Sequence, residues 1–237
     1  MCGKFTAMFS WREVHYYSDL LTPFLTAEKA AESEPAQDEI VLSTPMRITP
    51  VVCLDDNGKR AVVPMRWGWV DPQTSDPLKK PGMMHARGET ADTKPLWKQA
   101  FANTRGIIWV DTFNVGEELP GGKVKQWTCR HAEGRPLALG VIWEKWVHPR
   151  FGSLHTYVLV STDSPPMVHS KDDRFPLVMD NESDISLWLG EASAPLEEIK
   201  TLVRAYPGPL IVDEEKKEEP KSTKAKAKPS NDQPSLF

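Results

Sequence analysis

The fold is decided by four runs between Gly106 and Thr162, which read GIIWVDTF (106–113), KVKQWTC (123–129), LALGVIW (137–143) and TYVLVST (156–162). Several of these runs are rich in β-branched and aromatic residues, which favour strands. They follow one another without regular helical crossovers, which argues against a parallel α/β sheet. The pattern predicts a single α+β domain with a largely antiparallel, barrel-like β-sheet and flanking helices.

Further elements are predicted on both sides of this segment. VVCL and AVVPM flank the turn-forming residues 55–58 (DDNG), which predicts a hairpin. A Ser-x-x-Glu capping box starting at Ser10 precedes an apolar-periodic stretch and predicts a helix over about 11–21. A short helix is expected from Lys94 through Phe101, and a last helix with one apolar face begins at Pro195.

Composition narrows the class of protein. The chain has 237 residues, 40% of them hydrophobic and 26% charged, which is ordinary for a globular protein with a buried core. No apolar run approaches the roughly 18 residues that a membrane span needs, and the N-terminus lacks the pattern of a secretory signal. Three scattered cysteines cannot build a disulfide framework, so we expect a cytoplasmic protein. The net charge of −4 argues against a nucleic-acid coat but leaves room for a local basic groove.

Two polar segments suggest the domain organisation. We expect one domain over 1–212, in which 27–39 (AEKAAESEPAQDE) forms a mobile insertion or a short exposed helix. Residues 213–237 are rich in acids and lysines and almost devoid of apolar residues, so we expect a disordered tail.

Cys2 is the residue that points to chemistry. Methionine is usually removed before a small residue, and that would leave Cys2 at the N-terminus with an α-amine and a thiol on adjacent carbons. These two nucleophiles can close on an aldehyde, because the amine forms an imine and the thiol then adds to give a thiazolidine. The common phosphate, dinucleotide, zinc-protease and dithiol motifs are absent, so we expect no metal and no cofactor.

The N-terminal MCGKF resembles the MCGRF that opens the SRAP domain family, the SOS response-associated peptidases and abasic site processing proteins. Further motifs similar to those of the family follow in the same order over about 1–190: Arg47-Ile-Thr-Pro50, Arg66-Trp-Gly-Trp69, His85-Ala-Arg-Gly-Glu-Thr90, Arg105 through Asp111, Gly140-Val-Ile-Trp-Glu-Lys-Trp146, Ser161-Thr162 and His169 to Pro176. The resemblance implies a sensor of abasic sites in single-stranded DNA, and therefore a protein associated with the nucleoid. In such a protein the N-terminal cysteine forms a thiazolidine with the ring-opened deoxyribose.

The family also implies a Glu, a His and an Asn around that cysteine, and this sequence matches them unevenly. Cys2 and His169 match. His85 stands at the Asn position, where it can still donate a hydrogen bond and titrate near neutrality. The catalytic candidates are therefore Cys2, His169 and His85, with either histidine as the base.

Val115 stands at the position of the family Glu and cannot transfer protons. Glu117 or Glu118 can substitute for that Glu only if the strand end slips or bulges. General acid–base assistance is typically worth about 10²–10⁴-fold. We therefore expect capture of abasic DNA with altered kinetics.

DNA contacts are expected from the basic and aromatic residues of these motifs, with Lys4 and Arg47 replacing the family's Arg and Asn. The candidate DNA-binding residues are Lys4, Arg47, Arg66, Trp67, Trp69, Arg87 and Arg174. The alternative for each Trp is core packing, and the alternative for each Arg is a solvated surface.

Three functions stay open at this point. The first is a sensor that cross-links itself to abasic single strands. The second is a non-covalent single-stranded DNA-binding protein or replication-associated adaptor. The third is a cysteine-dependent peptidase that acts on itself or on a leader.

The C-terminal QPSLF (233–237) resembles the peptide by which many bacterial replication and repair proteins bind the sliding clamp. Leu236 and Phe237 suit a hydrophobic pocket, and Gln233 supplies a polar anchor. We therefore expect two partners for a monomeric protein, abasic single-stranded DNA and the bacterial sliding clamp.

Overall fold

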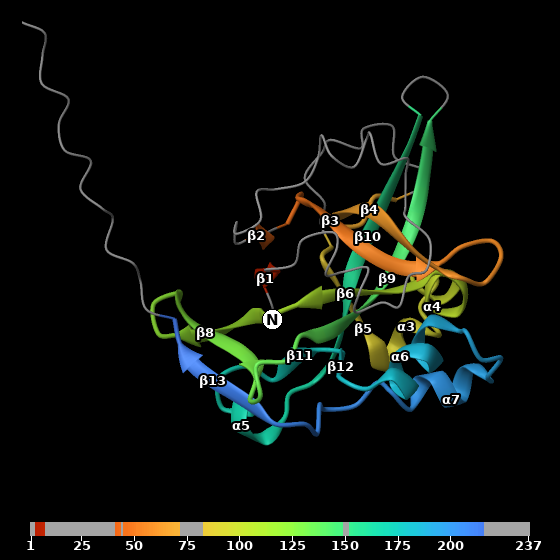
Figure 1. The fold of residues 1–237 in the computed structure, drawn as a ribbon. Coiled ribbons are helices and arrows are strands. Elements are labelled where there is room, and N and C mark those ends of the chain that lie inside the picture. Colours follow the sequence, from red (N-terminus) through yellow and green to blue (C-terminus); the bar gives the residue numbers. More distant parts are fainter. Residues whose placement is uncertain (1–2, 8–40, 44, 72–82, 149–151, 216–237) are drawn as a thin grey trace, which may run out of the picture.

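The computed structural model describes residues 3–7, 41–43, 45–71, 83–148 and 152–215, and its strands form two sheets (Figure 1). The smaller sheet has five antiparallel strands in the order β13-β8-β7-β1-β2. Its strands are β1 (Phe5–Ala7), β2 (Val41–Ser43), β7 (Thr112–Leu119), β8 (Lys123–His131) and β13 (Leu210–Glu214). The N-terminal strand therefore lies inside this sheet and is paired on both edges.

The larger sheet has the order β11-β10-β4-β3-β6-β9-β12, and β5 pairs with β10. Its strands are β3 (Ile48–Leu54), β4 (Arg60–Trp67), β5 (His85–Arg87), β6 (Arg105–Val110), β9 (Leu137–His148), β10 (Gly152–Asp163), β11 (Arg174–Pro176) and β12 (Val178–Met179). Because β10 also pairs with β9, the strands β10, β4, β3, β6 and β9 close a ring. This closure confirms the barrel-like sheet. Among the described strands, the pairings of β10 with β4 and β5 are parallel and the others are antiparallel.

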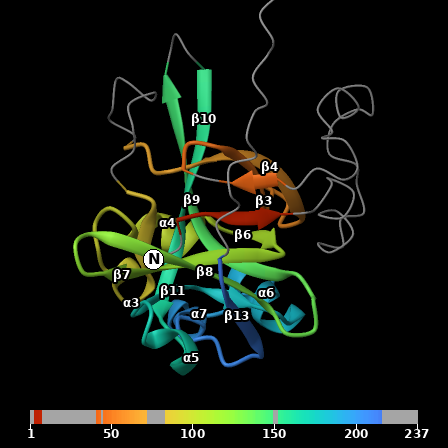
Figure 2. The same cartoon turned by 90° about the vertical axis from the view of Figure 1, so that its left-hand side faces the viewer.

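Helices gather on one side of the barrel, as Figures 1 and 2 show for α3, α4, α6 and α7. The described helices are α3 (Gly88–Ala91), α4 (Lys98–Asn103), α5 (Pro166–His169), α6 (Glu182–Leu189) and α7 (Leu196–Lys200). None of the helices in the described ranges is long and apolar enough to cross a membrane. The long ribbon of β9 and β10 extends beyond β3 and β4 (Figure 1).

Alternate residues of the barrel strands belong to two apolar clusters, as the period of a β-strand requires. One cluster, which we call the outer cluster, packs against α3, α4, α6 and α7 and therefore lies outside the ring. Val52, Ile107 and Trp188 belong to it. The other, which we call the inner cluster, contains the opposite faces of the same strands, including Trp67 and Tyr157. The inner cluster also contains core residues of the five-stranded sheet, so it joins the two sheets.

Several predicted elements are confirmed, and others need correction. The hairpin around 55–58 is formed, with Leu54 opposite Arg60. The helix predicted from Lys94 begins at Lys98 after a turn, and the helix predicted from Pro195 ends at Lys200. The described fold continues past residue 212, because β13 runs through Glu214 in register with β8. The predicted helix over 11–21 and the segment 27–39 lie outside the described residues.

Candidate site at the N-terminal strand

The N-terminal strand is fixed to the sheet immediately after the candidate nucleophile. The backbone N–H of Asn114 donates to the carbonyl of Lys4 at 3.0 Å, and Phe5 lies opposite Phe113 in the ladder. The side chain of Phe5 is fully buried in the inner cluster. Cys2 itself lies outside the described residues, but the chain attaches it to Gly3, which is exposed.

A row of aromatic rings connects this strand to His85. The ring centroids of Phe5 and Trp67 are 5.3 Å apart, and those of Trp67 and His85 are 6.1 Å apart in an edge-on arrangement. The indole N–H of Trp67 also donates to the carbonyl of Met84, the residue before His85. The structure therefore brings the half-buried His85 to the region where the N-terminal strand begins.

Backbone hydrogen bonds hold Arg47 beside Trp67, the middle ring of this aromatic row. The N–H of Met46 donates to the carbonyl of Trp67 at 2.9 Å, and the N–H of Trp67 donates to the carbonyl of Arg47 at 3.0 Å. Met46 has a φ of 74°, a left-handed conformation that costs a non-glycine residue about 1–3 kcal/mol. The Arg47 side chain is exposed, so it is available to an anionic ligand.

His169 approaches the inner cluster through its neighbour in α5. Val168 is fully buried in that cluster together with Phe5 and Val115. His169 is exposed, and its backbone N–H donates to the carbonyl of Pro165. The elements that carry Gly3, His85, Val115 and His169 thus converge on one cluster.

Val115 is fully buried and leaves this position without a carboxylate. The ladder between β7 and β8 is unbroken from Thr112 to Leu119, so no slip or bulge moves Glu117 or Glu118 to residue 115. Glu117 lies two residues further on the same face, and the indole N–H of Trp127 donates to its Oε2 at 2.8 Å.

Glu117 also borders the loop that follows His169. It lines a cavity of about 340 Å³ formed by residues 116–118 and 170–173. The ammonium group of Lys171 lies 4.4 Å from the centroid of the Trp127 ring. Glu118, Asp172 and Asp173 line the same cavity, and Glu117 is the carboxylate that Trp127 holds at its own position.

Trp67 and Trp69 are core residues, which corrects the expectation that they stack on DNA bases. Trp67 is fully buried in the inner cluster, whereas Trp69 is 4% exposed and packs edge-on against Trp97 in the outer cluster, with ring centroids 4.8 Å apart. Gly68 between them has a φ of 116°, a conformation that only glycine adopts easily. That turn directs the two indoles into different clusters and leaves neither face available for a base.

Arg174 is also committed to the fold, which corrects its assignment to the DNA groove. Its two terminal nitrogens each lie 2.9 Å from an oxygen of Glu89, and Nη2 also donates to the carbonyl of Ser161 at 2.8 Å. Asp163 contacts Nη1 at 3.1 Å. A bidentate, largely buried guanidinium of this kind holds β11, β10 and α3 together.

The remaining arginines of the predicted set differ in exposure. Arg87 is exposed beside His85, so it can contact a phosphate. Arg66 is 6% exposed, and its Nε and Nη2 have no hydrogen-bond partner in the part of the chain that the structure describes. Burial lowers the pKa of the Arg66 guanidinium. The unpaired nitrogens of Arg66 are suited to an acceptor supplied by a ligand.

The other two cysteines are poor nucleophiles. Cys53 and Cys129 are buried in the inner cluster. Burial, reinforced by the charge of Asp55, raises the pKa of the Cys53 thiol to about 12. A thiol needs to ionise to react, so neither buried cysteine competes with Cys2 as a nucleophile. Within the described ranges, no three His, Cys, Asp or Glu side chains come close enough to hold a metal ion.

Three carboxylates contact the predicted residues Arg174 and Lys4 and were missed by the sequence analysis, namely Glu89, Asp163 and Glu215. Glu89 is a partner of Arg174, and it lies in the quoted motif that begins at His85. Glu215 lies 2.5 Å from the ammonium group of Lys4, although it was assigned to the tail. No local pattern signals the pairs made by Glu89 and Glu215, because the partners are 85 and 211 positions apart in the chain.

The sequence and fold resemble proteins of one family. The model of the family described as "SOS response associated peptidase (SRAP)" matches residues 1–216. The abasic site processing protein YoqW of Bacillus subtilis is 24% identical over 207 residues, which cover 87% of this chain and 88% of YoqW. The abasic site processing protein HMCES of Gallus gallus is 26% identical over 171 residues, which cover 63% of this chain and 51% of HMCES.

Solved structures share the fold at low sequence identity. A protein from Bacteroides thetaiotaomicron aligns with a TM-score of 0.75 at 14% identity, covering 91% of this chain and 93% of its own. A phage-related protein from Bordetella bronchiseptica aligns with a TM-score of 0.66 at 16% identity, covering 92% and 95%.

Proposed function

The chain belongs to the SOS response associated peptidase (SRAP) family, and on that premise we propose that it captures abasic sites in single-stranded DNA through Cys2. The observation that carries the proposal is the anchoring of Phe5, which is fully buried three residues after Cys2. A nucleophile at a chain end needs a fixed attachment point, because catalysis depends on orientation. The names of the relatives YoqW and HMCES support an abasic site as the substrate.

The proposed reaction is a condensation at the aldehyde of the ring-opened deoxyribose. After removal of Met1, the α-amine of Cys2 attacks the aldehyde carbon, and loss of one water gives an imine. The Cys2 thiolate then adds to the imine carbon, the nitrogen takes up a proton, and a five-membered thiazolidine results. The sum is one aldehyde and one cysteine converted to one thiazolidine and one water.

The proton transfers fall to the histidines in this proposal. His85 lies in the aromatic row that starts at Phe5, and His169 extends from a helix anchored in the same cluster. Either imidazole can accept a proton from the amine or donate one to the leaving water. Val115 cannot do so, and therefore the reaction is expected to be slower than with a carboxylate at that position.

Recognition of the strand is proposed to rest on exposed cations around the N-terminal strand. The half-buried Lys4 precedes Phe5, the exposed Arg47 is bonded through its backbone to Trp67, and the exposed Arg87 follows His85 by two residues. Two nitrogens of Arg66 that have no partner among the described residues add a buried donor. Cations of this kind bind phosphates in a salt-dependent way, even on a protein with net negative charge.

The test is a denaturing gel of the purified protein mixed with single-stranded DNA that contains one abasic site. A heat-stable protein–DNA band is expected with the wild type and not with Cys2→Ala, and intact mass should show that Met1 is absent. A retained Met1 would exclude the thiazolidine. DNA binding without the band would favour the non-covalent adaptor, and cleavage of the chain itself or of a leader would favour the peptidase.

We also propose that Gln233, Leu236 and Phe237 bind a bacterial sliding clamp. These residues lie outside the described part of the chain, and the support is the sequence QPSLF together with the position of Glu215. Glu215, the last residue that the structure describes, lies beside Lys4, so a clamp bound to the motif would be attached to the fold next to the N-terminal strand. A peptide covering residues 228–237 should bind a purified clamp, whereas the same peptide with Leu236→Ala and Phe237→Ala should not. Equal binding of the two peptides would remove the clamp as a partner.

A further inference from the structure

Two acids end the last strand and a third follows it directly, and each of the three pairs with a different cation. The pairs are Asp213 with Arg130 at 3.3 Å, Glu214 with Lys125 at 2.8 Å and Glu215 with Lys4 at 2.5 Å. The cations come from β8 and from the N-terminal strand, so one short acidic segment neutralises positive charge on two neighbouring parts of the sheet. We call residues 213–215 the acidic strap.

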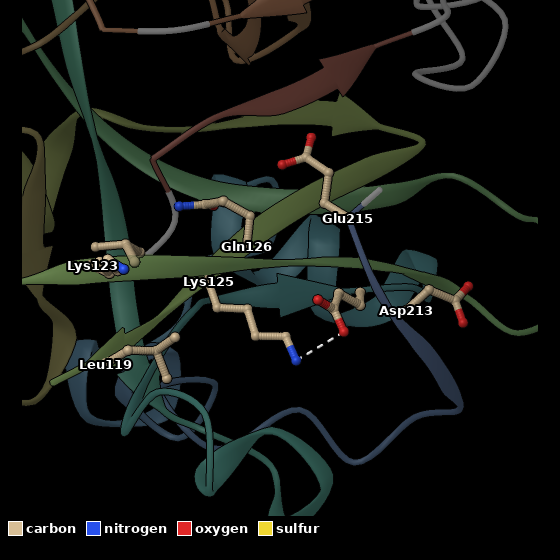
Figure 3. Close-up of a pocket in the computed structure, with 8 residues that line it drawn as sticks. Leu119, Lys123, Lys125, Gln126, Asp213 and Glu215 are labelled. Atoms are coloured by element: carbon tan, nitrogen blue, oxygen red, sulfur yellow. Dashed lines mark ion pairs between the residues drawn. The ribbon is translucent and has the colours of Figure 1, made fainter. Parts of the chain in front are cut away.

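The strap reaches both faces of the five-stranded sheet. Asp213 lies opposite Thr128 and Glu214 lies opposite Trp127, so successive side chains alternate between the faces. The backbone N–H of Glu215 continues the pairing by donating to the carbonyl of Gln126 at 2.9 Å. Figure 3 shows Lys125 paired on one side of the strand, with Gln126 and Glu215 directed to the other side.

All three ion pairs are accessible to solvent. The Lys4 and Glu215 side chains are 27% and 33% exposed. In the other two pairs the acidic side chains are more exposed, at 57% for Glu214 and 63% for Asp213. Ion pairs at a surface are weak, because water and salt screen them. A phosphate oxygen offers the same cation an equivalent charge-assisted hydrogen bond. A phosphate can replace a carboxylate at one of these cations if the carboxylate side chain rotates away. The backbone does not have to move, so β13 can stay paired with β8.

The strap borders a cavity with room for part of a ligand. Its volume is about 910 Å³, and its lining consists of Leu119, Lys123, Val124, Lys125, Gln126 and residues 213–215 (Figure 3). Leu119 and Val124 are 37% and 53% exposed, so the cavity offers apolar surface next to lysines. This combination suits a single strand, whose phosphates are anionic and whose sugars and bases are partly apolar.

We propose that the acidic strap competes with the phosphates of single-stranded DNA for Lys4, Lys125 and Arg130. The inference rests on the proposed function for the identity of the ligand. DNA that reaches the N-terminal strand has to displace carboxylates, so undamaged single strands are held weakly. A phosphate that replaces a carboxylate releases its own counterion, but the freed carboxylate takes up a cation from solution, so these contacts add little net salt dependence to binding.

The test compares two proteins that carry the same charge. One has the strap neutralised, with Asp213→Asn, Glu214→Gln and Glu215→Gln. The other has three exposed acids of the β3–β4 turn and α7 neutralised, with Asp56→Asn, Glu197→Gln and Glu198→Gln. Binding of an undamaged fluorescent oligothymidylate is measured by anisotropy over a range of salt concentrations, and melting curves check that each protein is folded.

The strap variant should bind more tightly than the wild type, and its plot of log K against log salt should be steeper by about 2, since each of three freed cations adds about 0.7 for a single strand. The control should keep the wild-type slope. If the triple variant does not fold, Glu215→Gln alone should steepen the slope by about 0.7.

Equal slopes for the strap variant and the control would overturn the proposal, as would the absence of any binding by all three proteins at low salt. The proposed function fails on a different measurement, the Cys2-dependent band with abasic DNA. A steeper slope without that band would leave the strap as a competitor at a non-covalent DNA site.

Discussion

The ring of Phe5 lies 5.3 Å from the ring of Trp67, inside an apolar cluster that joins the two sheets. This contact connects the strand that follows Cys2 to the barrel, and the Trp67 ring in turn contacts His85. The position of the N-terminal residues therefore depends on packing in the core, and their reactivity should respond to core substitutions.

Phe5→Ala should lower the free energy of unfolding by about 3–5 kcal/mol, the usual cost of removing a fully buried phenyl ring. The same variant should lose most of its cross-linking to abasic DNA, because the strand end is no longer held. Urea unfolding and the denaturing gel measure the two effects. Ile48→Ala is the control, since Ile48 is 66% exposed and should change stability by about 0.5 kcal/mol or less. Unaltered cross-linking by folded Phe5→Ala would show that anchoring is not required.

Substitution of Arg87 should affect DNA binding, whereas substitution of Arg174 should affect the stability of the fold. Arg87→Ala should weaken single-stranded DNA binding and reduce the salt slope by about 0.7, because an exposed cation is lost. Arg174→Ala should leave the slope unchanged and lower stability by on the order of 2 kcal/mol, because its hydrogen bonds to Glu89 and Ser161 disappear. Anisotropy and thermal unfolding of both proteins provide the comparison. A reduced salt slope for Arg174→Ala would return this residue to the DNA groove.

Alkylation of the native protein by iodoacetamide at neutral pH should modify Cys2 and spare the other two cysteines. Cys53 is 2% exposed with a pKa raised to about 12, and Cys129 is fully buried. Peptide mass spectrometry locates the modified residue, and the protein unfolded in guanidinium serves as the control in which all three react. Rapid modification of Cys53 in the native state would mean that the inner cluster opens readily.

His169→Ala should slow cross-linking by about 10²–10⁴-fold while leaving DNA affinity nearly unchanged. The histidine is exposed on α5, so its removal should not disturb the core. Single-turnover gels give the rate, and anisotropy gives the affinity. Met167→Ala, at a 49% exposed position of the same helix, should retain the wild-type rate. Parallel losses of rate and affinity would assign His169 a structural role.

Val115→Glu should speed cross-linking or its reversal if residue 115 stands where the sequence resemblance predicts the family Glu, since the substitution places a carboxylate there. The new side chain enters an apolar cluster, and burial raises the pKa of a carboxyl group. A pKa raised above that of the unfolded chain means that the variant is most stable at low pH and loses stability as pH rises through the folded-state pKa.

Val115→Gln is the matched control, because it brings the same shape without titration. Both variants should lose about 1–3 kcal/mol from burying a polar group, and only the Glu variant should lose more as the pH rises. Rate measurements and urea unfolding at several pH values separate the two proteins. Identical cross-linking rates for the Glu and Gln variants would place residue 115 away from the chemistry.

Much of the sheet could be predicted, because strand residues carry a local signal. The four β-branched and aromatic runs all became strands, and the turn at 55–58 formed the expected hairpin. The helix α6 was not predicted, although its ends were marked: the side chain of Asn181 accepts from the N–H of Asp184, and Gly190 adopts a φ of 89°. A search for caps before apolar periodicity would have found it.

The fate of individual side chains could not be predicted in the same way. The local sequence around a Trp does not show whether its ring is exposed for stacking or buried in the core. The turn at Gly68 places Trp67 and Trp69 in separate clusters. The partners of Arg174 and Lys4 lie far away in the chain, at Glu89 and Glu215. Pairings at such distances are created by the fold. The roles of Cys2 and of residues 233–237 stay predictions, since they lie outside the described residues.

The central place of β1 in its sheet has a consequence for how the protein is made. Phe5 leaves the ribosome early, but its ladder partner Phe113 is synthesised more than a hundred residues later. Until then the N-terminal strand has no β7 to pair with, and the growing chain presents its first residues to the enzymes that trim nascent proteins. The proposed function requires removal of Met1; if that removal takes place on the nascent chain, the α-amine of Cys2 becomes available before β1 has paired with β7. Slowing synthesis between residues 5 and 113 would lengthen that interval, and speeding it would shorten it.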